Sequence, residues 1–268
     1  MIMVDTKPFA VVPHGKGFFC AMITEASPAI IMRVKDFGES DLLVTFFTPH
    51  KGQLKGVAKG ARRSLKRFVN ALDICSLINL EFTSKREGSL CLLHSGKLMN
   101  PYPALRSDFG ALSKASFMIE MTEILFPVGI ADPNMFELLK EAFEAMAEGR
   151  PAALIALIFE ARAMALGGYG INLERCAVCG RPYKGEGMAV FNRERGTVSC
   201  LKCQEPSALS PAMTPDTVGV LEKMQGETLS RSQSLMLGDE ILEELKSVLK
   251  LHREYRLEKK LKTAKYVE

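Results

Sequence analysis

The chain has 268 residues, of which 47% are hydrophobic and 25% charged, and its formal net charge is +4. This composition excludes a disordered chain and is typical of a globular protein with one large or two modest domains. We find no apolar run of membrane-spanning length and no secretory signal, so we expect a cytoplasmic protein with reduced thiols.

The charge is unevenly distributed along the chain. Residues 24–100 carry 12 Lys and Arg against 7 Asp and Glu, whereas residues 101–172 carry 5 against 9. A basic segment next to an acidic one indicates nucleic-acid binding by the first and protein contacts by the second.

The first hundred residues predict a flexible extension followed by a small barrel. Residues 1–23 contain Pro and Gly and show no helical or strand period, so we expect a flexible extension. Residues 24–100 contain five apolar or alternating segments, with a turn at Glu87 and Gly88 before the last: Ala29–Val34, Leu42–Thr48, Gln53–Lys59, Leu72–Phe82 and Leu90–Met99. Five strands joined by short turns predict an OB-type barrel, with an SH3-like barrel as the alternative. We expect Cys75 and Cys91 in strands and, like Cys20, unpaired.

The connection between the third and fourth predicted strands is strongly cationic. Lys59–Arg67 contains five basic residues and no acidic one, and further cations lie on the neighbouring strands. A phosphodiester backbone suits such a surface, and the alternative is a solvated charge run. The predicted nucleic-acid-binding residues are Arg33, Lys35, Lys55, Lys59, Arg62, Arg63, Lys66 and Arg67, with Lys51 beside them. The aromatic rings in this region, which are able to stack on bases but are expected in the core, are Phe37, Phe46, Phe47 and Phe68.

From residue 101 the apolar period changes to that of helices. Proline, glycine and capping residues, with Asp132 as the cap before Pro133, set the predicted helices at Ser107–Phe126, Pro133–Glu148, Pro151–Leu166, Thr214–Met224 and Gly238–Lys262. The third is apolar on all sides, which predicts the centre of a bundle. The basic tail from Arg253 to Lys265 is expected to be a solvated helix end, with nucleic-acid contact as the alternative.

Four cysteines form two C-x2-C pairs separated by twenty residues: Cys176, Cys179, Cys200 and Cys203. This spacing is typical of a tetrahedral zinc site, and the alternative is two unrelated pairs. Between the pairs, Met188–Phe191 and Thr197–Ser199 read as short strands joined by a turn at Asn192–Gly196. We therefore expect one structural Zn²⁺ in a ribbon at residues 173–206. The ribbon lies inside an all-helical domain at residues 101–268, which follows the barrel at 24–100, so the fold class is α+β.

Nothing in the sequence indicates catalysis. Four thiolates leave no open position on a zinc ion, and no H-E-x-x-H or phosphate-binding-loop motif is present. The four histidines show no motif spacing. A zinc-dependent enzyme would need an open ligand position, so we expect a binding protein. A zinc-ribbon scaffold or adaptor with incidental nucleic-acid binding is the main alternative.

Several segments together resemble one known family. Arg33–Thr45 (RVKDFGESDLLVT) and Gly56–Ser64 (GVAKGARRS) resemble the bacterial recombination mediator RecO family. The sequences around Gly167–Gly170 (GGYG), Cys176–Gly180 (CAVCG) and Tyr255–Lys262 (YRLEKKLK) match as well. The resemblance covers about residues 24–266, and a typical member begins close to Met22.

The resemblance implies an OB barrel, a helical domain and, in many members, the four-cysteine site. It also implies a DNA repair protein that binds single- and double-stranded DNA and anneals complementary strands without ATP. Such a protein helps load the RecA recombinase onto strands coated by single-strand-binding protein. The implied partners are therefore DNA, RecR, single-strand-binding protein and, indirectly, RecA, on the nucleoid and without a membrane.

Overall fold

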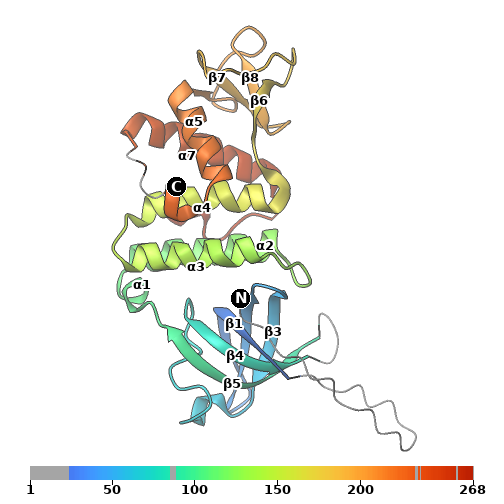
Figure 1. Cartoon of the computed structure of the whole chain (residues 1–268), viewed down its shortest axis with the longest axis vertical. Helices are drawn as coiled ribbons and strands as arrows, with labels where there is room; N and C mark the ends of the chain where they lie inside the picture. Colours follow the sequence, from blue (N-terminus) through green and yellow to red (C-terminus); the bar gives the residue numbers. More distant parts are fainter. Residues whose placement is uncertain (1–23, 85–88, 233–234, 236, 258, 268) are drawn as a thin grey trace, which may run out of the picture.

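The computed structural model describes residues 24–84, 89–232, 235, 237–257 and 259–267. A β-barrel lies at one end of the molecule, a layer of helices lies across it, and a small sheet lies at the opposite end (Figure 1). The predicted extension at residues 1–23 and the predicted turn at Glu87 and Gly88 fall outside the described residues, so both stay predictions.

Five strands form the barrel: β1 (Thr24–Phe37), β2 (Asp41–Thr48), β3 (Gly52–Ala58), β4 (Leu77–Thr83) and β5 (Cys91–Asn100). They follow the order β1-β2-β3-β5-β4, and β4 pairs with β1 again, which closes the barrel. The β3–β5 pair is parallel, and the other pairs are antiparallel. A small closed barrel of five strands with this crossover confirms the predicted OB-type fold.

The fourth strand begins later than the sequence predicts. We expected it from Leu72, but β4 starts at Leu77, and the preceding residues form turns. Cys75 has a left-handed backbone (φ 66°), its N–H donates to the carbonyl of Ile31, and the N–H of Ile31 donates to the carbonyl of Ser76. The prediction that Cys75 lies in a strand is therefore wrong, while Cys91 is in β5 as expected. Leu72 is buried inside the barrel, although its backbone does not pair as a strand. Its apolar side chain therefore fits the alternating pattern of a strand in a segment that forms turns.

Seven α-helices follow in the described residues: α1 (Pro103–Ser107), α2 (Phe109–Leu125), α3 (Pro133–Ala147), α4 (Ala152–Met164), α5 (Pro215–Gly226), α6 (Leu229–Ser232) and α7 (Asp239–Arg256). The predicted caps are confirmed, since the Asp132 side chain accepts from the N–H groups of Asn134 and Met135, and Thr214 accepts from that of Thr217. The short helices α1 and α6 were not predicted. Asp108 separates α1 from α2, so the helix expected from Ser107 begins at Phe109 instead.

Helix α4 is the centre of the helical layer, as its apolar sequence predicts. By length and composition the stretch Ala152–Tyr169 would suffice to cross a membrane, so our expectation that no run reaches that length is wrong for the described residues. Half of that stretch is buried inside the fold. Its Glu160 carboxylate forms a buried ion pair with Arg253 of α7 at 2.7 Å. In this fold the stretch acts as the core helix against which the other helices pack.

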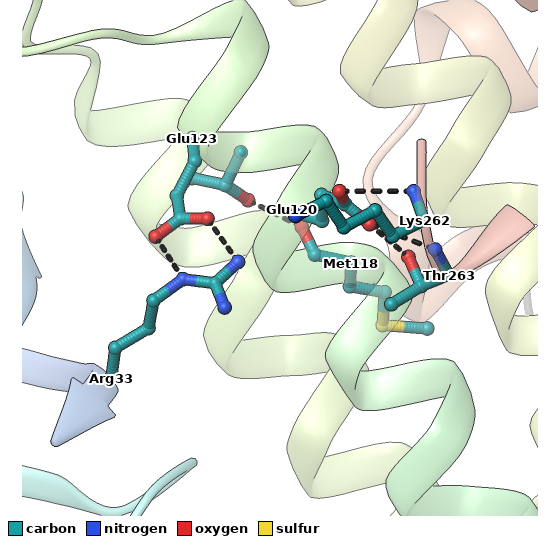
Figure 2. A network of polar contacts seen from close by, with 7 residues as sticks. Arg33, Met118, Glu120, Glu123, Lys262 and Thr263 are labelled. Carbon is teal, nitrogen blue, oxygen red and sulfur yellow. Dashed lines mark hydrogen bonds and ion pairs between the residues drawn. The ribbon is translucent and has the colours of Figure 1, made fainter. Parts of the chain in front are cut away.

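The last helix is shorter than predicted because the chain after it packs back on α2. Helix α7 ends at Arg256, and Leu257 has an extended backbone. The Glu120 carboxylate of α2 accepts hydrogen bonds from the backbone N–H groups of Lys262 and Thr263 and from the Thr263 hydroxyl (Figure 2). Burial alone would raise the pKa of Glu120, but these hydrogen bonds and the charge of Arg33 lower it below its ordinary value. Arg253 is buried, so the expected solvated helix end is also wrong at that residue.

The barrel and the helical layer share one apolar contact. Ile30 and Phe47 pair across β1 and β2 on the outer face of the barrel, and both are fully buried in the core of the helical layer. The ring of Phe47 meets that of Phe126 edge-on at 6.4 Å. The Arg33 guanidinium forms a bidentate ion pair with Glu123 of α2 (Figure 2), and its side chain remains 48% exposed. An ion pair that is this exposed contributes at most about 1 kcal/mol, whereas burying one Phe contributes about 1.5–3 kcal/mol.

The small sheet at the far end contains β6 (Asn172–Cys176), β7 (Ala189–Asn192), β8 (Thr197–Cys200) and β9 (Ala212–Met213) in the order β6-β8-β7-β9. The predicted hairpin is confirmed as β7 and β8. We missed β6 and β9, which are too short to show a period. One face of the sheet supplies Phe191, Val198 and Met213 to the core of the helical layer, so the ribbon is packed on the helices rather than tethered.

We predict that Gly52→Ala disrupts the contact between the barrel and the helices and lowers the stability of the protein. Gly52 has φ 61°, and a Cβ there would lie 1.9 Å from the Ile130 carbonyl oxygen in the α2–α3 connection. Gly38, with φ 73° and no atom within 4 Å of an added Cβ, is the matched control. Gly38→Ala should cost only the left-handed backbone penalty, about 1–2 kcal/mol. Gly52→Ala should cost about 1–3 kcal/mol more because of overpacking. Urea unfolding measures both, and equal losses would contradict this account of the interface.

Candidate nucleic-acid interface and metal site

The four cysteines of the ribbon converge on one point. The sulfur atoms of Cys176, Cys179, Cys200 and Cys203 all lie within 4.8 Å of one another, and those of Cys179 and Cys200 are 4.0 Å apart. A tetrahedral zinc ion with Zn–S bonds of about 2.3 Å requires sulfur atoms about 3.8 Å apart. The four thiols therefore fit a metal ion with only a small contraction, and two unrelated pairs are excluded.

Two tight turns place these sulfur atoms. The first runs from Cys176 to Gly180, whose N–H donates to the Cys176 carbonyl and whose φ of 71° is one that glycine adopts without strain. The second begins at Cys200, whose carbonyl accepts from the N–H groups of Cys203 and Gln204. Cys176 ends β6 and Cys200 ends β8, and these strands lie side by side, so the sheet brings the two turns together.

The pKa values of the thiols also agree with the binding of a cation between them. Burial would raise the pKa of Cys176, but the backbone N–H groups of Cys179, Cys200 and Val178 donate to its sulfur and lower the pKa to about 6. The neighbouring thiols, those of Cys200 and Cys179 first, raise the pKa of Cys203 to about 12. Four adjacent sulfur atoms cannot all ionise without a positive charge between them, and a bound metal ion supplies that charge.

The cationic connection Lys59–Arg67 is anchored at both ends. Its start is held by the N–H of Gly60, which donates to the Asp41 carboxylate, and a single 3-10 turn follows at Ala61–Arg63. At its end, Phe68 is buried in the barrel core. The cations between these anchors are exposed: Lys59, Arg62, Arg63, Lys66 and Arg67. The connection therefore presents its charges to solvent from a fixed backbone.

The predicted cations of the strands share one face of the barrel. Arg33 pairs with Thr45, and Thr45 pairs with Lys55, so their side chains leave the same face of β1, β2 and β3. Lys35 lies two residues after Arg33 on that face. Beyond these cations the same face is covered by α2 and α3, so the exposed part lies next to the helical layer.

Two of the predicted nucleic-acid-binding arginines, Arg33 and Arg62, have acidic partners in the structure. Arg33 is bound to Glu123, as described above, so its guanidinium meets a phosphate only by releasing or sharing that carboxylate. The connection itself contains no acidic residue, but the Asp36 carboxylate of β1 lies 3.6 Å from the Arg62 guanidinium, and both side chains of this pair are exposed. Within the described residues, Arg63 and Lys66 form no ion pair.

The aromatic rings of the barrel are mostly in the core, as expected. Phe46, Phe47 and Phe68 are buried, whereas Phe37 at the end of β1 is 48% exposed. Phe37 follows Lys35 on the same face, so it is the ring of the four that can reach a base.

Sequence reasoning missed an aromatic and arginine cluster where the ribbon meets α7. The guanidinium carbons of Arg193 and Arg256 lie 5.7 and 5.5 Å from the centre of the Tyr255 ring. Arg193 belongs to the turn between β7 and β8, far from α7 in sequence. The segment Tyr255–Lys262 is one of the motifs that carry the family resemblance. Its contact with Arg193 of the ribbon turn leaves no pattern in the local sequence, so sequence reasoning did not find it.

The comparisons with known proteins agree over both parts of the chain. Residues 22–102 match the family model "Recombination protein O N terminal", and residues 106–265 match "Recombination protein O C terminal". "DNA repair protein RecO" of Syntrophobacter fumaroxidans is 39% identical over 67% of this chain and 71% of its own length. The proteins of that name from Syntrophus aciditrophicus and Geobacter metallireducens are 29% and 32% identical, over 91% and 75% of this chain and 95% and 80% of their own lengths. Together with the barrel, the helical layer and the cysteine cluster, these matches show that the chain belongs to the RecO family of DNA repair proteins.

Proposed function

We propose that this protein is a recombination mediator that binds single- and double-stranded DNA and anneals complementary strands without ATP. Together with RecR it helps load RecA onto strands coated by single-strand-binding protein, in the bacterial cytoplasm and on the nucleoid. The observation that carries the proposal is the exposed cationic connection Lys59–Arg67, fixed at both ends beside Lys35 and Lys55 on an OB-type barrel. Exposed cations on a fixed backbone bind phosphates with little loss of conformational freedom.

We further propose that the cysteine cluster holds one structural Zn²⁺. Four sulfur ligands are the set that zinc prefers in closed sites, and they leave no position for a reacting water. The metal would supply charge and a cross-link between β6 and β8, with no role in a reaction. No catalytic residue is assigned, because the proposed activity consists of binding and aligning strands.

Strand annealing tests the function directly. We expect the protein to accelerate the pairing of complementary oligonucleotides without ATP, both bare and coated with single-strand-binding protein. Quenching of a fluorophore on one strand by the other measures the rate. Binding to DNA without any acceleration of annealing would instead favour the scaffold or adaptor.

The cationic connection should contribute most of the DNA contact. Each phosphate contact contributes about −0.7 to the slope of log affinity against log salt on single strands. Replacing Arg62, Arg63 and Lys66 by Ala should therefore flatten the slope by about two units and weaken binding to all sequences alike. Arg67 is left in place because it donates to the Lys59 carbonyl and so supports the loop.

A variant with three cations removed from the helical surface is the matched control: Lys140, Arg150 and Lys246. It lowers the net charge equally, and fluorescence anisotropy over a salt series compares the two variants. An equal change of slope in both would mean that only the overall charge matters, and the connection would then be a solvated charge run.

Zinc content and stability should fall together in the double variant Cys176→Ser, Cys203→Ser. Metal binding to such sites contributes about 10–16 kcal/mol, so the two turns should lose their structure without it. The control is Cys91→Ser, which changes a buried thiol in β5 and should leave the metal content at one per chain. Elemental analysis measures zinc, and its absence from wild-type protein purified without chelators would contradict the proposal.

A further inference from the structure

The ribbon turn and the end of α7 together form a second cationic surface. Arg193 and Arg256 approach the same exposed ring, that of Tyr255, which is 48% exposed. Arg256 also donates to the Glu194 carbonyl. It lies so close to the turn that a Cβ on Gly196 would be 2.5 Å from its guanidinium nitrogen. The two arginines are thus held together by contacts between residues that are 62 positions apart in the chain.

These guanidinium groups have no acidic partner in the part of the chain that the structure describes. Among the described residues, neither Arg193 nor Arg256 forms an ion pair with a carboxylate, and the contacts made by Arg256 on the turn are to a backbone carbonyl. A guanidinium held by an aromatic ring keeps its full charge and its N–H donors. Two such groups side by side therefore offer charge and N–H donors to a phosphate oxygen.

A hollow lies between Arg256 and Glu123, the partner of Arg33 of the barrel. Its volume is about 340 Å³, and its lining includes Arg256, Lys259, Tyr169 and Glu123. Among the described residues of that lining, Glu123 is the only acidic one, and it is already paired with Arg33 of β1 (Figure 2). The described lining therefore carries more positive than negative charge between Arg256 and the Arg33–Glu123 pair.

From these contacts we propose that Arg193 and Arg256, positioned by Tyr255, bind the phosphate backbone of the same DNA strand that lies on the barrel, after it has passed the hollow beside Glu123. This inference rests on the proposed DNA binding by the barrel and extends it to the ribbon. It assigns the motif at Tyr255–Lys262 a role: Tyr255 positions the arginines, Arg256 binds the strand, and Lys259 lines the hollow that the strand passes. The ribbon then serves to place Arg193.

The test compares short and long single strands. An OB-type barrel covers about 4–16 nucleotides, so oligothymidylates of about 8 and about 40 nucleotides separate binding by the barrel from binding along the whole path. Arg193→Gln should leave binding of the short strand unchanged and should flatten the salt slope for the long strand by about 0.7. Adding Tyr255→Leu, which releases Arg256 as well, should flatten it by about 1.4 in total. Tyr255→Phe keeps the ring and should behave like the wild type.

Arg195→Gln is the matched control, because Arg195 lies in the same turn and bears the same charge but donates to the Ala177 carbonyl instead of approaching Tyr255. Equal effects of Arg193→Gln and Arg195→Gln would overturn the proposal, as would an unchanged slope for the long strand. An equal loss on both lengths would also overturn it, because the surface would then not continue the barrel path. Zinc content and melting temperature confirm that each variant keeps the ribbon.

The experiment distinguishes a failure of the ribbon contact from a failure of the proposed function. If wild-type protein binds neither length, the function itself fails. If wild-type protein binds both, and the variant of Arg62, Arg63 and Lys66 weakens both while the Arg193 variants change nothing, only the ribbon contact fails.

Discussion

The packing of helix α2 against the outer face of the barrel is the contact on which the other surfaces depend. Phe47 of β2 meets Phe126 at the end of that helix, and Ile30 is buried in the same apolar cluster. On the same helix, Glu123 binds Arg33 near the start of the described chain and Glu120 binds Thr263 near its end. The apolar contact supplies most of the free energy, because the Arg33–Glu123 pair is too exposed to contribute more than about 1 kcal/mol. The two carboxylates instead fix which side chains lie beside the helix.

This arrangement relates the two candidate surfaces to each other. The barrel is fixed on α2 and α3, and the ribbon is fixed on α7 through Phe191, whose ring meets that of His252 at 5.8 Å. Because α4 packs between these helices, neither end is free to reorient without exposing apolar core. A strand that reaches the ribbon from the barrel therefore meets preorganised cations at both ends of its path. A tethered ribbon would have to order on binding, at a cost in affinity.

Sequence reasoning succeeded where the signal is local and failed where it is not. Asp132 and Thr214 cap helices through hydrogen bonds to residues two or three positions ahead, and the paired cysteines close tight turns, so a short window is enough to predict them. The prediction that the fourth strand begins at Leu72 failed, because Leu72 is apolar for another reason: its side chain fills the barrel interior beneath a turn. Helix α7 ends early because of hydrogen bonds to Glu120, 143 residues away from Thr263. No propensity encodes such a partner.

The candidate sites show the same difference between features with a local sequence signal and features that depend on distant partners. The cysteine cluster was predictable to the residue, because two C-x2-C pairs at that spacing are typical of four sulfur atoms that converge on one point. The cations were predictable only as a set, because the charge that each one offers depends on distant acids: Asp36 for Arg62, and Glu123 for Arg33. A count of basic residues therefore overstates the charge available on the barrel, whereas it holds for Arg193 and Arg256 at the ribbon, which have an aromatic ring as partner. A ring holds a guanidinium in place without neutralising it, which a carboxylate cannot do. In this protein that difference separates arginines that hold the fold together from arginines that remain available to a phosphate.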